Sequence, residues 1–385
     1  MIIYSLVSNQ GGMLRVAESL AKVFTKLPSD FPLRVFIFSE QMPCELNDPR
    51  FVWFPYESKS NTNWEQTSIQ LKKSINTYLN GQEVEWVIGD FMTLDFFEDI
   101  EAKFCYDVHF LGRPFYNALS KSKSALKLDN FHRNNFVLGL HLNHFPFLKK
   151  EHDLMKKSLR FIVNSKTSEK SLMEDYKDVV TGKSVIRIVV SSSLNNFLPS
   201  EPSLLKSLYY HGRFHPQKGI QNLFEHDWTN LPLTIRGFED ALLTPDRVSW
   251  LLDKGITALA WTGDSGILRG ELMEHQAVLF PSIYEPWGLS LQEALALGKI
   301  CIAHPCNGGH EEQITDGENG FLVDFSSPHL IRNIEEILNL PLNVLEMVKQ
   351  RARSSSHLGH DDRLDEMCNF FLELINFKEQ EVYEF

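Results

Sequence analysis

Short apolar runs rich in β-branched and aromatic residues alternate with helical patterns along most of the chain. In the first half, the runs that predict strands are Met1–Val7, Leu33–Phe38, Glu85–Ile88, Lys103–Phe110, Phe136–Leu142, Phe161–Val163 and Ser184–Val190. A helical pattern follows the first of these runs, through Val16, Leu20 and Val23. Strands separated by helices are typical of a parallel sheet covered on both faces. The first half of the chain is therefore expected to be an α/β domain.

The same alternation starts again after Ser191–Ser203, a stretch rich in Ser, Asn and Pro that has the composition of a linker. Here the predicted strands are Ser207–Tyr210, Leu233–Ile235, Ile256–Trp261, Ala277–Phe280, Lys299–Ala303 and Gly320–Val323. At 385 residues the chain is also long for one domain. We predict an N-terminal domain over 1–195 and a C-terminal domain over 196–365. Residues 366–385 belong mostly to a helical pattern and are expected to cross back to the first domain.

Charge and composition argue against several classes of protein. Acidic residues outnumber basic ones, 50 to 38, whereas a nucleic-acid binder usually carries a basic surplus. No apolar run approaches the roughly 18 residues that a membrane-spanning helix needs. The N-terminal run lacks a charged n-region and predicts a first strand, not a signal peptide. The five cysteines contain no C-x-x-C pair, which favours a reducing, cytoplasmic compartment.

The most informative segment is Pro281–Val323, with the sequence PSIYEPWGLSLQEALALGKICIAHPCNGGHEEQITDGENGFLV. It begins where an apolar strand ends, and ligands of open α/β sheets bind beyond the carboxyl ends of the strands. Glu285 stands at that position. After a tight Pro-Trp-Gly loop, a helix is predicted to begin around Leu289–Ser290, where unpaired N–H groups suit a phosphate. Glu293, in the first turns of that helix, can accept two hydrogen bonds from a diol such as a ribose.

Each of these features is common by itself, but together they resemble a known family. The run E-P-W-G-L-S-L-Q-E-A-L-A-L-G-K is similar to the E-x-x-F-G-L-x-x-x-E-A-x-A-x-G segment of retaining nucleotide-sugar glycosyltransferases of family 4. The stretches Gly308–Glu312 and Asp316–Gly320 match that family's following G-G-x-x-E and D-G-x-x-G elements. Trp287 replaces the usual Phe, and Lys299 replaces a frequent Pro. The resemblance implies the GT-B fold, in which two Rossmann-like α/β domains face each other across a cleft.

A second match follows the first predicted strand of the C-terminal domain. The run from Gly212 to Gly219, GRFHPQKG, resembles the family's G-R-x-x-x-x-K-G loop. A diphosphate that leaves water needs its charge compensated. The resemblance implies that the planar guanidinium of Arg213 and the compact ammonium of Lys218 supply that compensation.

Weaker matches extend the expected donor site. Loops that end in Gly237 and Gly263 are similar to those that border the nucleobase, and Gly12 opens the first helix as the family's glycine pair does. No G-x-G-x-x-G is present, so the dinucleotide fingerprint is absent. The donor-binding residues that the resemblance implies are Gly12, Gly212, Gly237, Gly263, Gly288, Leu289 and Glu293.

The family also carries a histidine at a strand end of the first domain, near the donor sugar. Two residues compete for this position: His109 ends the run AKFCYDVHF, and His141 follows the apolar run FVLGL. We favour His109 because the family's loop comes before a helix and then a strand-Ser element, which Ile162–Ser165 resembles. His141 lies closer to that element and is retained as the alternative.

The resemblance implies retaining transfer of a sugar from a nucleoside-diphosphate donor, a UDP- or GDP-sugar, without a cofactor or a metal. Arg213, Lys218 and the N–H groups near Gly288 would stabilise the leaving diphosphate. Glu285 would hold the donor sugar, and the expected catalytic set is Glu285, Lys218, Arg213 and His109. Cys301-x-x-His304-x-Cys306 follows no zinc spacing and lacks a fourth ligand.

These motifs are compatible with several acceptors and with two alternative functions. The acceptor can be a glycan, a lipid-linked molecule or a small molecule. Polysaccharide biosynthesis is the process we expect the enzyme to serve. The alternatives are a catalytically silent GT-B subunit that acts as a binding or scaffold partner, and another GT-B enzyme, an epimerase or a phosphorylase. The segment His144–Lys157 mixes apolar and basic residues. We interpret it as a surface helix with its preceding loop; the alternative is weak peripheral contact with an anionic membrane at its inner face.

Overall fold

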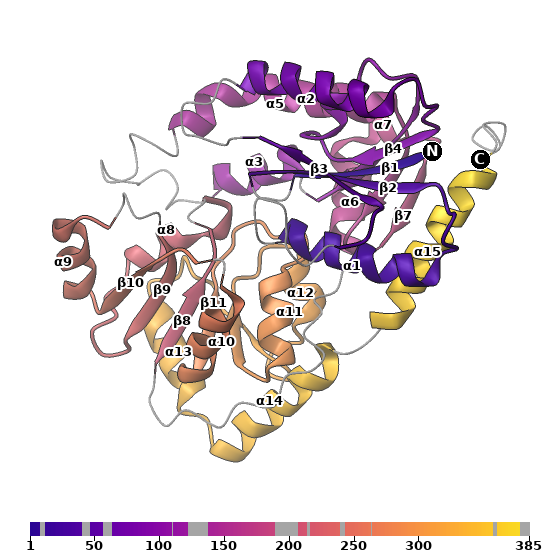
Figure 1. Ribbon diagram of the computed structural model, residues 1–385. Helices are drawn as coiled ribbons and strands as arrows, with labels where there is room; N and C mark the ends of the chain where they lie inside the picture. Colours follow the sequence, from indigo (N-terminus) through magenta and orange to yellow (C-terminus); the bar gives the residue numbers. More distant parts are fainter. Residues whose placement is uncertain are drawn as a thin grey trace. The chain divides into compact units, whose positions relative to one another are not determined.

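The chain divides into two compact units, each built around one parallel sheet (Figure 1). The computed structural model describes residues 1–7, 12–40, 47–56, 64–109, 111–121, 138–188, 207–213, 216–238, 243–262, 264–356 and 360–377. Unit 1 comprises Met1–Leu111, Phe145–Ser193 and Gly359–Phe385. Unit 2 comprises Gly112–His144 and Leu194–Leu358.

Unit 1 contains a seven-stranded sheet in the order β3-β2-β1-β4-β5-β6-β7, with every pair parallel. The strands are β1 (Ile2–Val7), β2 (Leu33–Ser39), β3 (Phe51–Pro55), β4 (Trp86–Gly89), β5 (Lys103–Val108), β6 (Ser158–Val163) and β7 (Ser184–Arg187). Parallel strands are buried on both faces, which is why they consist of nearly continuous apolar runs. All four residues of β4, for example, are buried.

The helices of unit 1 lie between these strands in the chain, except for the last one, which follows unit 2. They are α1 (Gly12–Lys26), α2 (Trp64–Leu79), the short η1 (Leu94–Phe97), the greater part of α5 (Leu138–Lys157), α6 (Lys166–Asp175), α7 (Lys177–Val180) and α15 (His360–Asn376). The last helix, drawn in yellow, lies alongside α1 (Figure 1). Its Met367, Phe370 and Phe371 join α1 and the sheet in one apolar core.

Unit 2 contains a six-stranded parallel sheet in the order β10-β9-β8-β11-β12-β13. The strands are β8 (Leu208–His211), β9 (Leu233–Phe238), β10 (Ile256–Ala260), β11 (Ala277–Phe280), β12 (Ile300–Ala303) and β13 (Phe321–Leu322). The helices are α3 (Gly112–Lys121), η3 (Pro216–Lys218), α8 (Ile220–Phe224), α9 (Pro245–Asp253), α10 (Ser265–Glu274), α11 (Leu289–Ala296), α12 (Gly309–Gln313), α13 (Leu330–Leu338) and α14 (Leu342–Ser356).

In both units the first strand lies inside the sheet, and the strand order reverses next to it. The reversal falls between β1 and β4 in unit 1 and between β8 and β11 in unit 2. Ligands of open α/β sheets bind at such a switch point, beyond the carboxyl ends of the strands. The topology therefore directs attention to the loops that follow these four strands.

Two features of the fold differ from the sequence predictions. The predicted strand at Phe136–Leu142 is wrong, because residues from Leu138 onward belong to α5; a short apolar run does not distinguish a strand from a buried helix. Residues 112–144, which we expected in the first domain, group with unit 2. None of the helices in the described ranges is long and apolar enough to cross a membrane.

Candidate functional site

The switch point of unit 2 brings two loops together. Strands β8 and β11 are hydrogen-bonded neighbours, with Leu208 opposite Ala277. The loop after β8 leads to Lys218, and the loop after β11 leads to Glu285. Gly219 has a φ of +62°, and a Cβ at this position would lie 1.9 Å from the carbonyl oxygen of Pro281. Only glycine therefore allows the two loops to approach this closely.

Lys218 and Glu285 form an ion pair in which Nζ lies 2.5 Å from Oε2. The hydroxyl of Ser282 donates a second hydrogen bond to the same carboxylate oxygen at 3.1 Å. Glu285 is only 7% exposed, and Ser282 is buried beside it. A buried charge is costly unless it is paired and hydrogen-bonded. The structure meets that requirement with one cation and one hydroxyl.

The protonation of Glu285 follows from these contacts. Burial by itself raises the pKa of this carboxyl, but the Lys218 ammonium, the neighbouring imidazole of His310 and the hydrogen bonds from Lys218 and Ser282 outweigh burial and lower its pKa. Glu285 is therefore an anion at neutral pH. An anion can accept hydrogen bonds from sugar hydroxyls.

The lowered pKa predicts how stability depends on pH. Ionised Glu285 stabilises the fold above the unfolded carboxyl pKa of about 4.3, and this contribution is lost as the pH falls through the lower folded pKa. The free energy of unfolding of the wild type is therefore expected to fall more steeply than that of Glu285→Gln between about pH 5 and pH 3. Urea unfolding across this range measures both slopes. Parallel curves for the two proteins would contradict the assignment.

Helix α12 donates hydrogen bonds to the loop between Glu285 and Gly288. The backbone N–H of Gly309 donates to the carbonyl of Glu285 at 2.7 Å. The side-chain amide of Gln313 donates to the carbonyl of Trp287 at 2.5 Å and lies 3.4 Å from the carbonyl of Gly288. The start and the end of the loop are thus both held by one short helix.

Gln313 is expected to stabilise this loop measurably. Replacing it by Ala removes the donor and should cost about 1 kcal/mol of unfolding free energy. Gln313→Glu should cost more, because a carboxylate would face carbonyl oxygens that need a donor. Thermal unfolding of the two variants and the wild type gives the ranking. Identical melting temperatures for all three proteins would show that the loop does not depend on Gln313.

Helix α11 begins directly after this loop. Gly288 precedes it with a φ of +93°, and among the described side chains none caps this end. The N–H groups of Leu291 and Gln292 are bonded back to the carbonyl of Gly288. Leu289 and Ser290 supply the first N–H groups of the helix, which carry the positive end of its dipole. This helix start can receive an anion next to Lys218 and Glu285.

The other site residues predicted in unit 2 differ in their exposure and in their contacts. Glu293 lies in α11 and is half-buried. Arg213 is exposed, and the hydroxyl of Tyr210 donates to its carbonyl at 3.4 Å. Gly237 has a φ of +136°, and a Cβ there would lie 1.9 Å from the carbonyl oxygen of Gly212, so the start of the loop after β8 lies against the end of β9. Gly263 lies outside the described residues.

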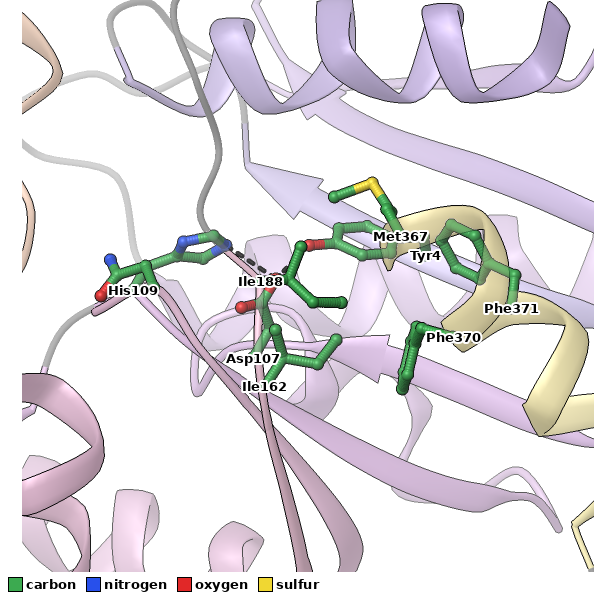
Figure 2. A pocket seen from close by; sticks show the side chains of 9 residues that line it. Tyr4, Asp107, His109, Ile162, Ile188, Met367, Phe370 and Phe371 are labelled. Atoms are coloured by element: carbon green, nitrogen blue, oxygen red, sulfur yellow. Dashed lines mark hydrogen bonds and ion pairs between the residues drawn. The ribbon is translucent and has the colours of Figure 1, made fainter. Parts of the chain in front are cut away.

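The predicted residues of unit 1 are only partly described. Gly12 is the first residue of α1, as expected, although its surroundings lie outside the described part. His109 follows β5, and its Nε2 lies 2.9 Å from the Asp107 carboxylate (Figure 2). His141 lies within α5, and its side chain is outside the described residues. The choice between the two histidines therefore stays a prediction.

Comparison with known proteins addresses the identity of unit 2. Residues 268–355, which contain Glu285, Gly288 and Glu293, match the family model described as glycosyl transferases group 1. This segment resembles the group 1 glycosyltransferases. The match confirms the resemblance stated from the sequence, while the narrower assignment to family 4 stays a prediction. A search of curated protein sequences found no match to the chain.

Solved structures of glycosyltransferases share the whole fold. Sucrose-phosphate synthase from Thermosynechococcus elongatus superposes with a TM-score of 0.74 at 18% identity, over 97% of this chain and 99% of the other. A glycosyltransferase from Rickettsia africae gives 0.62 at 16% identity, over 98% and 99%. HepE from Anabaena, in complex with UDP and glucose, gives 0.66 at 14% identity, over 98% and 99%. At such identities the likeness shows the fold, and it confirms the GT-B class.

Three residues that contact the predicted site residues were not predicted from the sequence. Ser282 bonds Glu285 from three residues away, and a Ser near a strand end is too common to be a signal. Gln313 follows the G-G-x-x-E element directly, and only the fold brings it to Trp287. Asp107 could have been found, because residues two apart in a strand share a face, and Asp107 precedes His109 by two.

The segment His144–Lys157 lies within α5, so its expected leading loop is helical. Lys150 pairs with Asp95 at 2.5 Å and Lys157 with Glu98 at 2.9 Å. Both basic groups thus contact acidic side chains of unit 1, which favours the surface-helix interpretation. Weak peripheral membrane contact stays a prediction.

Proposed function

We propose that the chain is a retaining glycosyltransferase that moves a sugar from a nucleoside-diphosphate donor to a glycan, lipid-linked or small-molecule acceptor. One observation carries the proposal: Lys218 and Glu285 are paired at the switch point of unit 2, beside the start of α11. A cation and a helix start suit the diphosphate, and an anion that can bond hydroxyls suits the sugar. The group 1 match over the same loop supports this assignment.

The leaving diphosphate develops negative charge as the glycosidic bond breaks. In our proposal Lys218, Arg213 and the N–H groups of Leu289 and Ser290 stabilise that charge. Groups that are already oriented before the reaction contribute most, since they need no rearrangement in the transition state. Lys218 meets this condition because its ion pair fixes it in the loop. The mechanism assigns no step to a metal ion.

Glu285 is assigned to the donor sugar and not to covalent catalysis. Retaining glycosidases that form a covalent intermediate use two carboxyl groups about 5–5.5 Å apart. The motifs offer Glu285 no such partner, and its contact with Lys218 stabilises the anion instead. We propose that the acceptor attacks from the side of the leaving group, with a diphosphate oxygen taking its proton.

The donor is proposed to be a UDP- or GDP-sugar. UDP is supported by HepE, whose structures contain UDP, UDP with glucose, and UDP-glucose. Glu293, in α11, is proposed to hold the ribose. The cysteine content supports a cytoplasmic location for the reaction.

A donor panel tests the proposal. The purified chain is incubated with UDP-, GDP- and ADP-sugars, with and without candidate acceptors, and the release of nucleoside diphosphate is measured. We expect one donor to be turned over and its sugar to keep its anomeric configuration, as read by NMR. A silent subunit would bind nucleotide without releasing diphosphate from any donor. A phosphorylase would instead release sugar phosphate from a glycan when inorganic phosphate is added.

A further inference from the structure

A buried cluster in unit 1 surrounds the carboxylate of Asp107. One of its oxygens, Oδ2, accepts a hydrogen bond from the hydroxyl of Tyr4 and lies 2.9 Å from Nε2 of His109 (Figure 2). Asp107 is 3% exposed. A single buried oxygen therefore contacts one phenol and one imidazole.

The strand register explains why these residues meet. Tyr4 in β1 is opposite Ile88 in β4, and Ile88 is opposite Cys105 in β5. Side chains two residues apart on a strand share a face, so Asp107 lies on the same face as Tyr4, one step nearer the carboxyl end. A tyrosine is long enough to reach across the intervening strand. His109 comes two residues after Asp107, at the carboxyl end of the sheet.

Helix α15 supplies the apolar side of this cluster. Met367, Phe370 and Phe371 line a cavity of about 10 Å³ together with Tyr4, Asp107 and His109 (Figure 2). That volume is close to the minimum of roughly 10–15 Å³ for one water molecule. Since bulk water cannot surround the carboxylate, its attraction to a neighbouring cation is screened less than at a surface.

The charged groups that act on His109 are Asp107 and, more weakly, Asp90 after β4. Burial tends to lower the pKa of His109, but the two carboxylates outweigh burial and raise its pKa. Tyr4 stays neutral, because burial and the charge of Asp107 raise the pKa of its phenol. The polar Asn164 and the apolar Ile162 complete the lining on the β6 side.

We propose that Asp107 and Tyr4 are positioning residues that hold the imidazole of His109 through the approach of its Nε2 to the Asp107 carboxylate, leaving Nδ1 for a hydroxyl of the bound sugar. The inference rests on the proposed function for the identity of that ligand, whereas the state of the imidazole is a property of the free protein. Tyr4 fixes the carboxylate, the carboxylate fixes the ring, and α15 covers the apolar side of the cluster. Asp107 itself touches no substrate.

NMR titration of the free protein tests whether Asp107 and Tyr4 act on the imidazole of His109. With histidine labelled by ¹⁵N, and the His109 signal assigned from a His109→Gln variant, Asp107→Asn should lower the His109 pKa by about 1–3. Tyr4→Phe leaves the carboxylate in place and should shift the His109 pKa by less, and it is the second variant to be titrated if Asp107→Asn does not fold. The matched control is Asp178→Asn, which alters an exposed pair with His152 at 2.7 Å, and should leave His109 unchanged.

Steady-state kinetics with the donor found in the panel test whether the positioning of His109 matters for sugar transfer. Asp107→Asn should lower kcat more than it changes KM, and the pH profile of kcat should move to lower pH with the His109 pKa. An unchanged His109 pKa in both Asp107→Asn and Tyr4→Phe overturns the inference whatever the activity. A shifted pKa with unaltered kcat overturns the positioning role. If the wild type turns over no donor, the proposed function fails, and the titration still decides how Asp107 acts on His109.

Discussion

Lys218→Ala is expected to reduce sugar transfer by about 10²–10³-fold, the usual cost of removing one oriented charge-stabilising donor. The ammonium lies 2.5 Å from Glu285 and is held next to the start of α11. The variant should also be less stable, because Glu285 would stay buried with no cation; losing one partner of a buried pair costs about 3–5 kcal/mol. Stopped assays of nucleoside diphosphate release and urea unfolding measure the two effects separately.

Two further variants make this result interpretable. Glu285→Gln removes the anion but leaves the partly exposed Lys218 in place, so it should lose transfer with a smaller loss of stability. Lys170→Ala alters an exposed ion pair with Glu174 in α6, where such pairs contribute about 0–1 kcal/mol, and it should behave as the wild type. Full turnover by purified Lys218→Ala would remove Lys218 from the mechanism.

Gly309→Ala is expected to abolish nucleotide binding and to destabilise unit 2. A Cβ at Gly309 would lie 2.0 Å from the carbonyl oxygen of Trp287, which is backbone and cannot rotate away. Overpacking of this kind costs about 1–3 kcal/mol, and occasionally more. Because the displaced carbonyl belongs to the loop before α11, the helix start should lose its alignment with Lys218. Titration with nucleoside diphosphate and thermal unfolding give the two readouts.

The control is Gly270→Ala in α10. A Cβ there meets no atom within 4 Å, and Ala is better than Gly in a helix by about 0.8–1.0 kcal/mol. This variant should bind nucleotide normally and unfold at the same or a higher temperature. If Gly309→Ala matched it in both measurements, α12 would not hold the loop.

Local structure could be predicted from the sequence where the functional residues follow one another closely in the chain. The segment from Glu285 to Glu293 is a strand end, a glycine turn and a helix start in succession, so its local structure could be predicted from residue types. Strands such as β11 were found because parallel strands buried on both faces are continuously apolar. β3, Phe51–Pro55, was missed, since it is short, lies at the edge of its sheet and ends in proline.

What escaped prediction depends on contacts between distant parts of the chain. Gln313 reaches a carbonyl 26 residues away, and Tyr4 reaches a carboxylate 103 residues away. Neither distance leaves a periodic signal in the sequence. The histidine of the first domain was ambiguous for a related reason. The predicted strand Lys103–Phe110 already placed Asp107 two residues before His109, but nothing in the sequence showed that Tyr4 bonds this carboxylate.

The position of a bound nucleoside diphosphate tests the central claim most directly. We expect crystals of the chain grown with the diphosphate released in the donor panel to show its phosphate oxygens within hydrogen-bonding distance of Lys218 Nζ and the backbone N–H of Leu289. The ribose should contact Glu293. A diphosphate that is well ordered elsewhere on the chain, with Lys218 still paired to Glu285 and the start of α11 uncovered, would contradict the account.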